Sequence, residues 1–327
     1  MTRLHIISGL LLLIMALFSL QFGAVDLSFV DLASALTGKA EETTALIIFE
    51  LRIPRLLLAL FVGAGLGISG AALQGLLRNP LADPGVLGIS AASSMGAVLA
   101  IHYGLTSLFS YALPLAAMLS GFLATAALFF ITRREASHLT IILLGVAISS
   151  LCGAMTSLLI SFAPSPVSMQ EMVMWMLGSL ENRSLTDVYL AGPFILIGMI
   201  MIFWQRRPLT SLTLGEDVAK SMGVDTEKTA LMIILGSALI VGAGVAVSGI
   251  IGFIGLITPH IARPFVQHDP GKTLIPSALI GALLLGFADI LVRLPGFYSE
   301  LRIGVVTAFI GAPFFLWVIF KTRREMR

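Results

Sequence analysis

The feature that most constrains this chain is a series of long apolar segments separated by short polar loops. Most segments run for about 18–22 residues, the helix length needed to cross a hydrocarbon core of about 30 Å. Hydrophobic residues make up 57% of the sequence and charged residues 12%, whereas soluble domains carry about 25% charged residues. The sequence therefore predicts an all-α polytopic membrane protein, because a spanning backbone must satisfy its own hydrogen bonds.

The apolar pattern predicts about ten transmembrane helices in a single domain that covers residues 1–327. The first segment is too long for the apolar region of a secretory signal, so it is interpreted as a retained span. Pro259 and Pro264 interrupt the eighth segment, which predicts a short or broken helix there. The spans are expected near residues 4–22, 54–76, 86–104, 110–131, 139–163, 187–204, 229–248, 250–267, 273–294 and 303–320.

Lysine and arginine set the expected orientation, because they are more frequent in cytoplasmic loops. With both termini in the cytoplasm, 14 of the 20 basic residues fall on the inside. The net charge of +2 describes these loops and gives no basis for a nucleic-acid partner. The basic residues that then face outward are Lys39, Arg52, Arg55, Arg183, Arg293 and Arg302.

Two distant glycine-rich segments resemble each other. GAGLGISG (63–70) and GAGVAVSG (242–249) agree at five of eight positions, and each is followed by a DPG, at 83–85 and at 269–271. The segments lie in the second and seventh spans, which run in opposite directions. This pattern favours an inverted-topology repeat, as in many transporters. The alternative is that small residues recur wherever helices pack closely.

The most polar long stretch, LTLGEDVAKSMGVDTEKT (212–229), lies between the sixth and seventh spans, on the predicted cytoplasmic side. Gly215 and Gly223 flank residues 216–222, which favour a short helix. Such a helix between two spans could be held by a partner and moved as a rigid body. The alternative is a solvated loop, which charge runs usually form.

The chain shows no energy source of its own. Asp289 is the one acid well placed inside a span, and Arg293 follows one helical turn later, so local neutralisation is favoured over a role in ion coupling. The GKT at 271–273 ends like a P-loop, but Val266 occupies the position of its first glycine. The energy is therefore expected to come from a partner protein.

The sequence gives little support for a metal site or a cofactor. The five histidines form no HExxH pair, and there is no cysteine cluster. His260 is expected to cap or pack the broken helix, and His138 could face a transport pathway. Cys152 is the only cysteine, so no intrachain disulfide can form.

Several motifs together resemble one family of membrane proteins, the permease subunits of the type II ATP-binding-cassette importers for iron–siderophore, haem and vitamin B12. They occur in the family's order and cover nearly the whole chain. These motifs are RIPR (52–55), SGAALQGLLRNPLADPGVLGIS (69–90), GEDVAKSMGV (215–224), SGIIGFIGLITPHIARP (248–264), FADILVR (287–293) and IGVVTAFIGAPFFLW (303–317).

The resemblance implies a multi-pass protein of the bacterial inner membrane that works with three kinds of protein partner. These are two cytoplasmic ATP-binding subunits, a periplasmic or extracellular substrate-binding protein, and a second permease subunit that is identical or a paralogue. The polar stretch resembles the coupling helix, Glu-Ala-Ala-x-x-x-Gly, that docks in a cleft of the ATPase. Its expected coupling residues are Gly215, Glu216, Asp217, Val218, Ala219, Lys220, Ser221, Met222 and Gly223.

The resemblance also gives a role to outward-facing arginines. At positions matching Arg52, Arg55 and Arg293, arginines of the family receive acidic residues of the binding protein, and guanidinium groups suit such pairing. The alternative for each is a side chain that extends to the membrane interface, and Asp289 could instead hold Arg293. Arg302 stands where many relatives have proline, and whether it meets a partner or an anionic substrate is left open.

The expected function is alternating access to a bulky metal complex, first a ferric siderophore and then haem or cobalamin. The chain itself is expected to carry out no covalent chemistry, with ATP hydrolysed on the partner. The rival is a secondary transporter driven by an ion gradient, which the scarcity of acids within the spans disfavours. A membrane enzyme would need a convergent catalytic arrangement, and the sequence shows none.

Overall fold

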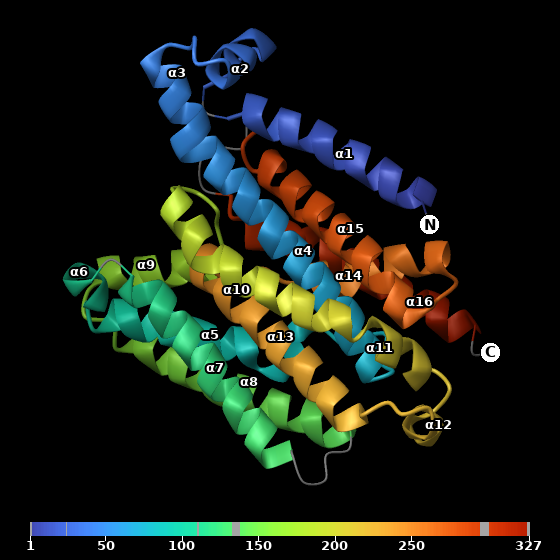
Figure 1. The fold of residues 1–327 in the computed structure, drawn as a ribbon. Coiled ribbons are helices and arrows are strands. Elements are labelled where there is room, and N and C mark those ends of the chain that lie inside the picture. Colours follow the sequence, from blue (N-terminus) through green and yellow to red (C-terminus); the bar gives the residue numbers. More distant parts are fainter. Residues whose placement is uncertain (1, 24, 110, 133–137, 295–300, 326–327) are drawn as a thin grey trace.

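The computed structural model describes residues 2–23, 25–109, 111–132, 138–294 and 301–325, which are almost entirely helical (Figure 1). Each of the ten predicted spans contains a helix. The predicted inside residues Arg133, Arg134 and Arg327, and the side chain of His138, lie outside the described part. The ten helices are α1 (Thr2–Gln21), α4 (Ile53–Leu76), α5 (Ile89–His102), α7 (Ala112–Thr132), α8 (His138–Ser161), α10 (Leu185–Trp204), α13 (Thr226–Ser248), α14 (Ile254–Ala262), α15 (Pro270–Leu291) and α16 (Ile303–Glu325).

Six of the described helical segments are long and apolar enough to cross a membrane, and α1, α5 and α16 contain shorter apolar segments. The eighth predicted span is short, as expected. α14 has nine residues, with Pro259 inside it, and Phe253 before it has a φ of +67°. A 3₁₀ turn, η3 (Arg263–Val266), with Pro264 near its start, follows directly. Proline removes a backbone donor, which explains why no long helix forms here.

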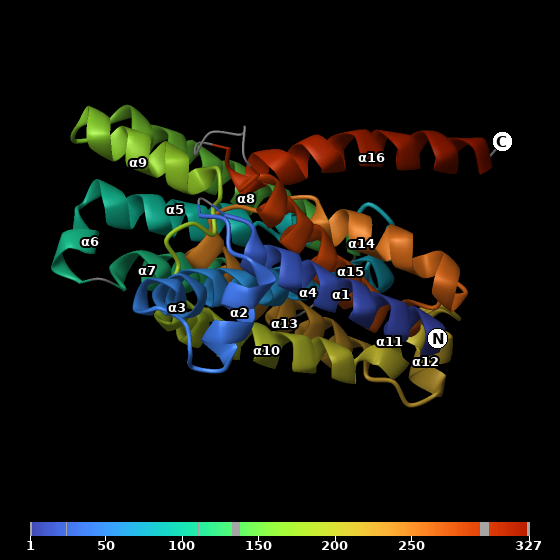
Figure 2. The same ribbon diagram turned by 90° about the horizontal axis from the view of Figure 1, so that it is seen from above.

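Short helices that the apolar pattern does not predict lie at the two ends of the bundle (Figures 1 and 2). One end carries α2 (Phe29–Leu36), α3 (Glu42–Leu46), a π-helix η1 (Ile47–Arg52), α6 (Leu105–Leu108) and α9 (Pro166–Met176). The other carries α11 (Arg206–Leu212) and the predicted short helix, α12 (Glu216–Ser221). The N-terminal end of α1 and the C-terminal end of α16 lie at the α12 end in both views.

The centre of the molecule is built on α4, α13 and α15, the most buried of the long helices. α4 crosses α15 at small residues. A Cβ atom added at Gly63 would lie 2.4 Å from the carbonyl oxygen of Gly281, and one at Gly67 would lie 2.2 Å from that of Ser277. At this separation only glycine fits, so the GxxxG spacing of α4 sets how closely the two helices approach.

The packing of the helices supports the predicted inverted repeat. α4 packs against α14 and α15, whereas α13 packs against α5 and α7, and α4 and α13 run in opposite directions (Figure 1). Within the matching segments, Gly67 of α4 faces Ser277 of α15, and Gly242 of α13 faces Met118 of α7. The α4 segment thus contacts α15, which lies two spans after α13. The α13 segment contacts α7, which lies two spans after α4.

The two DPG sequences have a local explanation. Asp83 accepts a hydrogen bond from the amide of Gly85 at the start of the 3₁₀ turn η2 (Pro84–Leu87), just before α5. Asp269 accepts one from the amide of Gly271 at the start of α15. Both are aspartate caps followed by proline at the first helical position, a common helix start. They begin different helices of the two halves and so do not mark equivalent positions.

The α4–α15 crossing gives a first prediction. Gly67→Val should lower the melting temperature of the purified protein, because overpacking a tight contact costs about 1–3 kcal/mol. Gly9→Val is the matched control, since a Cβ at exposed Gly9 of α1 meets nothing within 4 Å. Equal melting temperatures for the two variants would contradict the close crossing.

Candidate functional site

The predicted coupling segment is a six-residue helix held on one side by its own chain. α12 begins after Gly215, whose φ of +115° suits glycine. The Ala219 side chain is fully buried, and Lys220 pairs with Glu216 at 3.0 Å on the surface. The hydrogen bond to Glu216, aided by its charge, raises the pKa of Lys220. Lys220 therefore stays charged at neutral pH.

The outer side of the segment carries an apolar ridge, formed by Leu214, Val218 and Met222. Their exposed fractions are 63%, 46% and 60%. The residues are four apart, so Val218 and Met222 lie on one face of α12, with Leu214 just before it. These three apolar side chains are therefore available for contact on an otherwise polar segment.

Gly223 ends α12. Its φ is +83°, and the amides of Gly223 and Val224 donate to the carbonyl oxygens of Lys220 and Ala219 at 2.9 and 3.0 Å. This is the glycine-ended helix terminus. A Cβ added at Gly223 would meet nothing within 4 Å of its own chain, so a larger side chain would extend into solvent. Ala219, one of the expected coupling residues, points into its own subunit and is not part of the exposed face of the segment.

The helix before α12 joins the segment to the centre of the protein. α11 packs against α15 and α4. The Thr210 hydroxyl donates to the Asp269 carboxylate at 2.7 Å, and Arg78, just after α4, donates to the carbonyl oxygen of Leu212 at 2.6 Å. A Cβ at Gly271 of α15 would lie 2.0 Å from the carbonyl oxygen of Arg206. These contacts attach the link before α12 to α4 and α15, two of the three central helices.

At the opposite end, two of the three predicted docking arginines, Arg55 and Arg293, meet at Asp289. The carboxylate of Asp289, whose residue is fully buried, pairs with Arg55 of α4 and with Arg293, each at 2.8 Å. The favoured interpretation of Asp289 as a neutralising partner of Arg293 agrees with this geometry. The sequence did not indicate the second pair, because Arg55 and Asp289 are 234 residues apart.

Arg52 and Arg293 also hold the C-terminal end of α1. Arg52 donates to the carbonyl oxygens of Leu20 and Gln21, both at 2.6 Å, and of Val25. Arg293 donates to the Ser19 and Phe22 carbonyl oxygens at 2.8 and 3.0 Å. The last carbonyls of a helix lack intrahelical partners and carry partial negative charge, so arginine stabilises them well.

The three arginines therefore differ in how accessible they are. The exposed fraction is 6% for Arg52, and for the side chains of Arg293 and Arg55 it is 8% and 16%. Arg52 and Arg293 are engaged with α1, which leaves Arg55 as the most accessible of the three. Arg302, whose role the sequence left open, pairs with Glu181 at 3.2 Å.

From the sequence, His260 is expected to cap or pack the broken helix, and a metal site has little support. His260 of α14 lies 2.9 Å from the carbonyl oxygen of Pro80 through Nε2, so it packs the broken helix against the loop after α4. Within the described ranges, no three His, Cys, Asp or Glu side chains come together as a metal site would require.

Comparison with known proteins identifies the class to which this fold and these motifs belong. The hemin transport system permease protein HmuU of Yersinia pestis is 37% identical over 320 residues, covering 97% of this chain and 95% of HmuU. The vitamin B12 import system permease protein BtuC of Escherichia coli O9:H4 (strain HS) is 38% identical over 279 residues, 85% of each chain.

A solved structure gives the same result. A metal-chelate type ABC transporter in an inward-facing conformation superposes with a TM-score of 0.88 at 32% identity, covering 98% of this chain and all of the other. The family model of the FecCD transport family matches residues 11–321. The chain belongs to this family of ABC transporter permeases and has the type II importer permease fold.

Proposed function

We propose that this chain is the transmembrane subunit of an ATP-driven importer for a bulky metal complex. The observation that carries the proposal is the mounting of α12, an exposed apolar ridge on a segment fixed to α4 and α15. ATP is hydrolysed on a separate subunit, and its dimer closure shifts the population between outward-facing and inward-facing states. Each chain carries one such ridge, so a complex with two ATP-binding subunits requires a second permease subunit.

In this proposal the ridge of Leu214, Val218 and Met222 of each permease subunit occupies a cleft in one of the two ATP-binding subunits. The surrounding charges, including Asp217, determine how α12 aligns in the cleft more than how tightly it binds. The α12 end is then cytoplasmic, and both chain termini lie on that side. The substrate-binding protein docks at the opposite end, which carries α2, α3 and the arginines.

The ion-gradient alternative is less well supported. Coupling to protons or sodium ions requires an ionisable group that can bind and release the ion inside the membrane. Asp289, the acid that the sequence places within a span, is held in two ion pairs of 2.8 Å. Both carboxylate oxygens already face an arginine, so Asp289 does not suit a carrier that must bind and release an ion.

We propose a ferric siderophore as the first substrate, with haem and cobalamin as the other candidates. The named relatives transport hemin and vitamin B12, and the solved neighbour is of the metal-chelate type. The test is uptake by the reconstituted complex of a radiolabelled ferric siderophore, with hemin or cobalamin as competitor. Preferential uptake of hemin or cobalamin would reassign the substrate and leave the importer function intact.

The structure changes which arginine best tests docking. Arg55→Gln should weaken binding of the substrate-binding protein by about tenfold, equivalent to ~1.4 kcal/mol, because Arg55 is the most accessible of the three. Titration of the binding protein onto the reconstituted complex measures this. Arg183→Gln is the control, an arginine of the same end that lies 4.0 Å from Asp187. Unchanged affinity in Arg55→Gln would leave all three arginines as structural residues.

A further inference from the structure

The connection between α5 and α7, at the end of the bundle opposite α12, has an unusual surface for an exposed loop. It consists of the one-turn helix α6 and its flanking residues, and it lies at the edge of the bundle in both views (Figures 1 and 2). Five of its side chains are apolar or aromatic and exposed: Tyr103 by 67%, Leu105 by 40%, Leu108 by 81%, Phe109 by 52% and Tyr111 by 39%. These five residues are called the α6 surface below.

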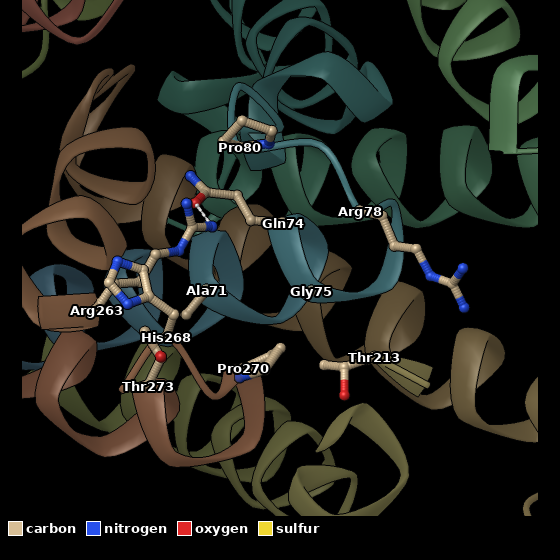
Figure 3. Close-up of a pocket in the computed structure, with 10 residues that line it drawn as sticks. All are labelled: Ala71, Gln74, Gly75, Arg78, Pro80, Thr213, Arg263, His268, Pro270 and Thr273. Atoms are coloured by element: carbon tan, nitrogen blue, oxygen red, sulfur yellow. Dashed lines mark hydrogen bonds between the residues drawn. The ribbon is translucent and has the colours of Figure 1, made fainter. Parts of the chain in front are cut away.

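The sequence around the α6 surface carries no charge. No Asp, Glu, Lys or Arg occurs from residue 103 to residue 132. By contrast, the connection from α1 to α4 at the same end contains Asp26, Asp31, Lys39, Glu41, Glu42 and Glu50. The α12 end is charged as well, and the basic residues Arg78, Arg263 and His268 line a cavity there (Figure 3). An exposed apolar patch without charges is typical of a surface that contacts a membrane or another protein.

The α6 surface continues onto one face of α7. Tyr111 is followed by Leu115, Leu119 and Leu123, which are exposed by 45%, 61% and 61%. These residues are four apart and therefore form one row along the helix. α7 is long and apolar enough to cross a membrane, and most of it is not covered by its own chain. The α6 surface is thus continuous with the apolar outer face of a membrane-crossing helix.

The aromatic residues at the two ends of α7 indicate the depth of the α6 surface. Phe130, exposed by 62%, lies near the far end, with its ring 5.9 Å from that of Phe129. The nineteen residues from Tyr111 to Phe130 correspond to about 28 Å of helix, close to the ~30 Å of a hydrocarbon core. Aromatic side chains are enriched at both interfaces of a membrane. This spacing places Tyr111, and Phe109 packed against it at 5.5 Å, at the level of the lipid headgroups.

The α6 turn satisfies its own polar groups. Gly104, with a φ of +64°, reverses the chain after α5. The Ser107 hydroxyl donates to the carbonyl oxygen of Gly104 at 2.7 Å, and the amide of Phe109 donates to the carbonyl oxygen of Leu105 at 3.1 Å. Burying a polar group costs much less when it is hydrogen-bonded, so the turn can enter a poorly hydrated layer.

We propose that the α6 surface is a membrane anchor that lies in the headgroup layer of the bilayer, with Leu108 and Phe109 in contact with the upper acyl chains. Its partner is the lipid bilayer, because a surface for a soluble protein would carry a polar rim. The anchor fixes the depth of the ends of α5 and α7, the two helices on which α13 packs. That this leaflet is the outer one rests on the function proposed above, whereas the depth does not.

The test is site-directed spin labelling of the full chain in vesicles of phosphatidylethanolamine and phosphatidylglycerol. The only cysteine is removed by Cys152→Ala, and one nitroxide is attached at Leu108→Cys. Its collision rates are measured with oxygen, which concentrates in hydrocarbon, and with a water-soluble nickel chelate. Glu41→Cys is the control for water, since Glu41 is exposed at the same end and its side chain makes no capping hydrogen bond. Leu119→Cys, in the middle of α7, is the control for the acyl chains.

The ratio of oxygen to nickel collisions at position 108 should be at least about threefold above that at position 41, equivalent to ~0.7 kcal/mol in partitioning. It should stay below the ratio at position 119. Equal ratios at 108 and 41 would overturn the proposal and leave the surface in water, open to a protein partner. Low collision rates with both reagents at 108 would also overturn it and would show that a second protein chain covers the surface. None of these results depends on transport or on an ATPase, so they are separate from the test of the importer function.

Discussion

Replacing Gly223 with tryptophan is expected to abolish transport while leaving a folded membrane protein. Gly223 has a φ of +83°, and the space beside it is open in its own chain. The indole would therefore extend from the end of α12 beside the ridge, where we place the ATPase. Steric exclusion there should cost far more than ~1.4 kcal/mol of docking energy and so reduce ATPase association by more than tenfold.

Gly38→Trp is the matched control for this variant. Gly38 also has a positive φ, of +70°, an open space around it and an exposed position, but it lies between α2 and α3 at the other end. Both variants carry a similar backbone strain of about 1–2 kcal/mol and the same added bulk. Co-purification of the ATPase with Gly38→Trp but not with Gly223→Trp supports the coupling segment. Normal uptake by Gly223→Trp would refute it.

Removing the carboxylate of Asp289 is expected to cause the largest loss of stability. Asp289→Ala leaves Arg55 and Arg293 with mutually repelling charges at a buried site, and Arg293 also holds the end of α1. Breaking a buried ion pair by removing one partner costs about 3–5 kcal/mol. We expect a marked fall in the melting temperature of the purified protein and loss of protection of the α1 end in hydrogen exchange.

Glu181→Ala provides the comparison for Asp289→Ala. Glu181 pairs with Arg302 at 3.2 Å, but its side chain is 46% exposed, and exposed pairs contribute only about 0–1 kcal/mol. The melting temperature should therefore change little. A similar small change in Asp289→Ala would show that the arginines are not compensated by this carboxylate, and would contradict the cluster.

The sequence predicts the membrane helices well, because the bilayer thickness sets the length of apolar run that a spanning helix needs. It also predicts the short eighth span, since Pro259 and Pro264 act locally on the backbone. The position of α12 follows from Gly215 and Gly223 in the same local way. In each case the signal lies within about one helix length of the element it determines.

The contacts that depend on folding were beyond sequence reasoning. Arg52 meets carbonyl oxygens about 30 residues earlier in the chain, and Arg293 meets the end of α1 more than 270 residues away. The sequence alone predicts that both arginines face outward, because it does not reveal that the end of α1 lies beside them. The inward direction of Ala219 depends in the same way on where α11 packs.

The most direct test of the central claim is purification of this chain from its native membrane in a mild detergent, followed by mass spectrometry of the proteins that accompany it. We expect a stoichiometric ATP-binding subunit that is lost in Gly223→Trp and retained in Gly38→Trp. A chain that purifies without any ATPase, yet moves substrate into liposomes under an ion gradient alone, would contradict the importer function and identify a secondary transporter.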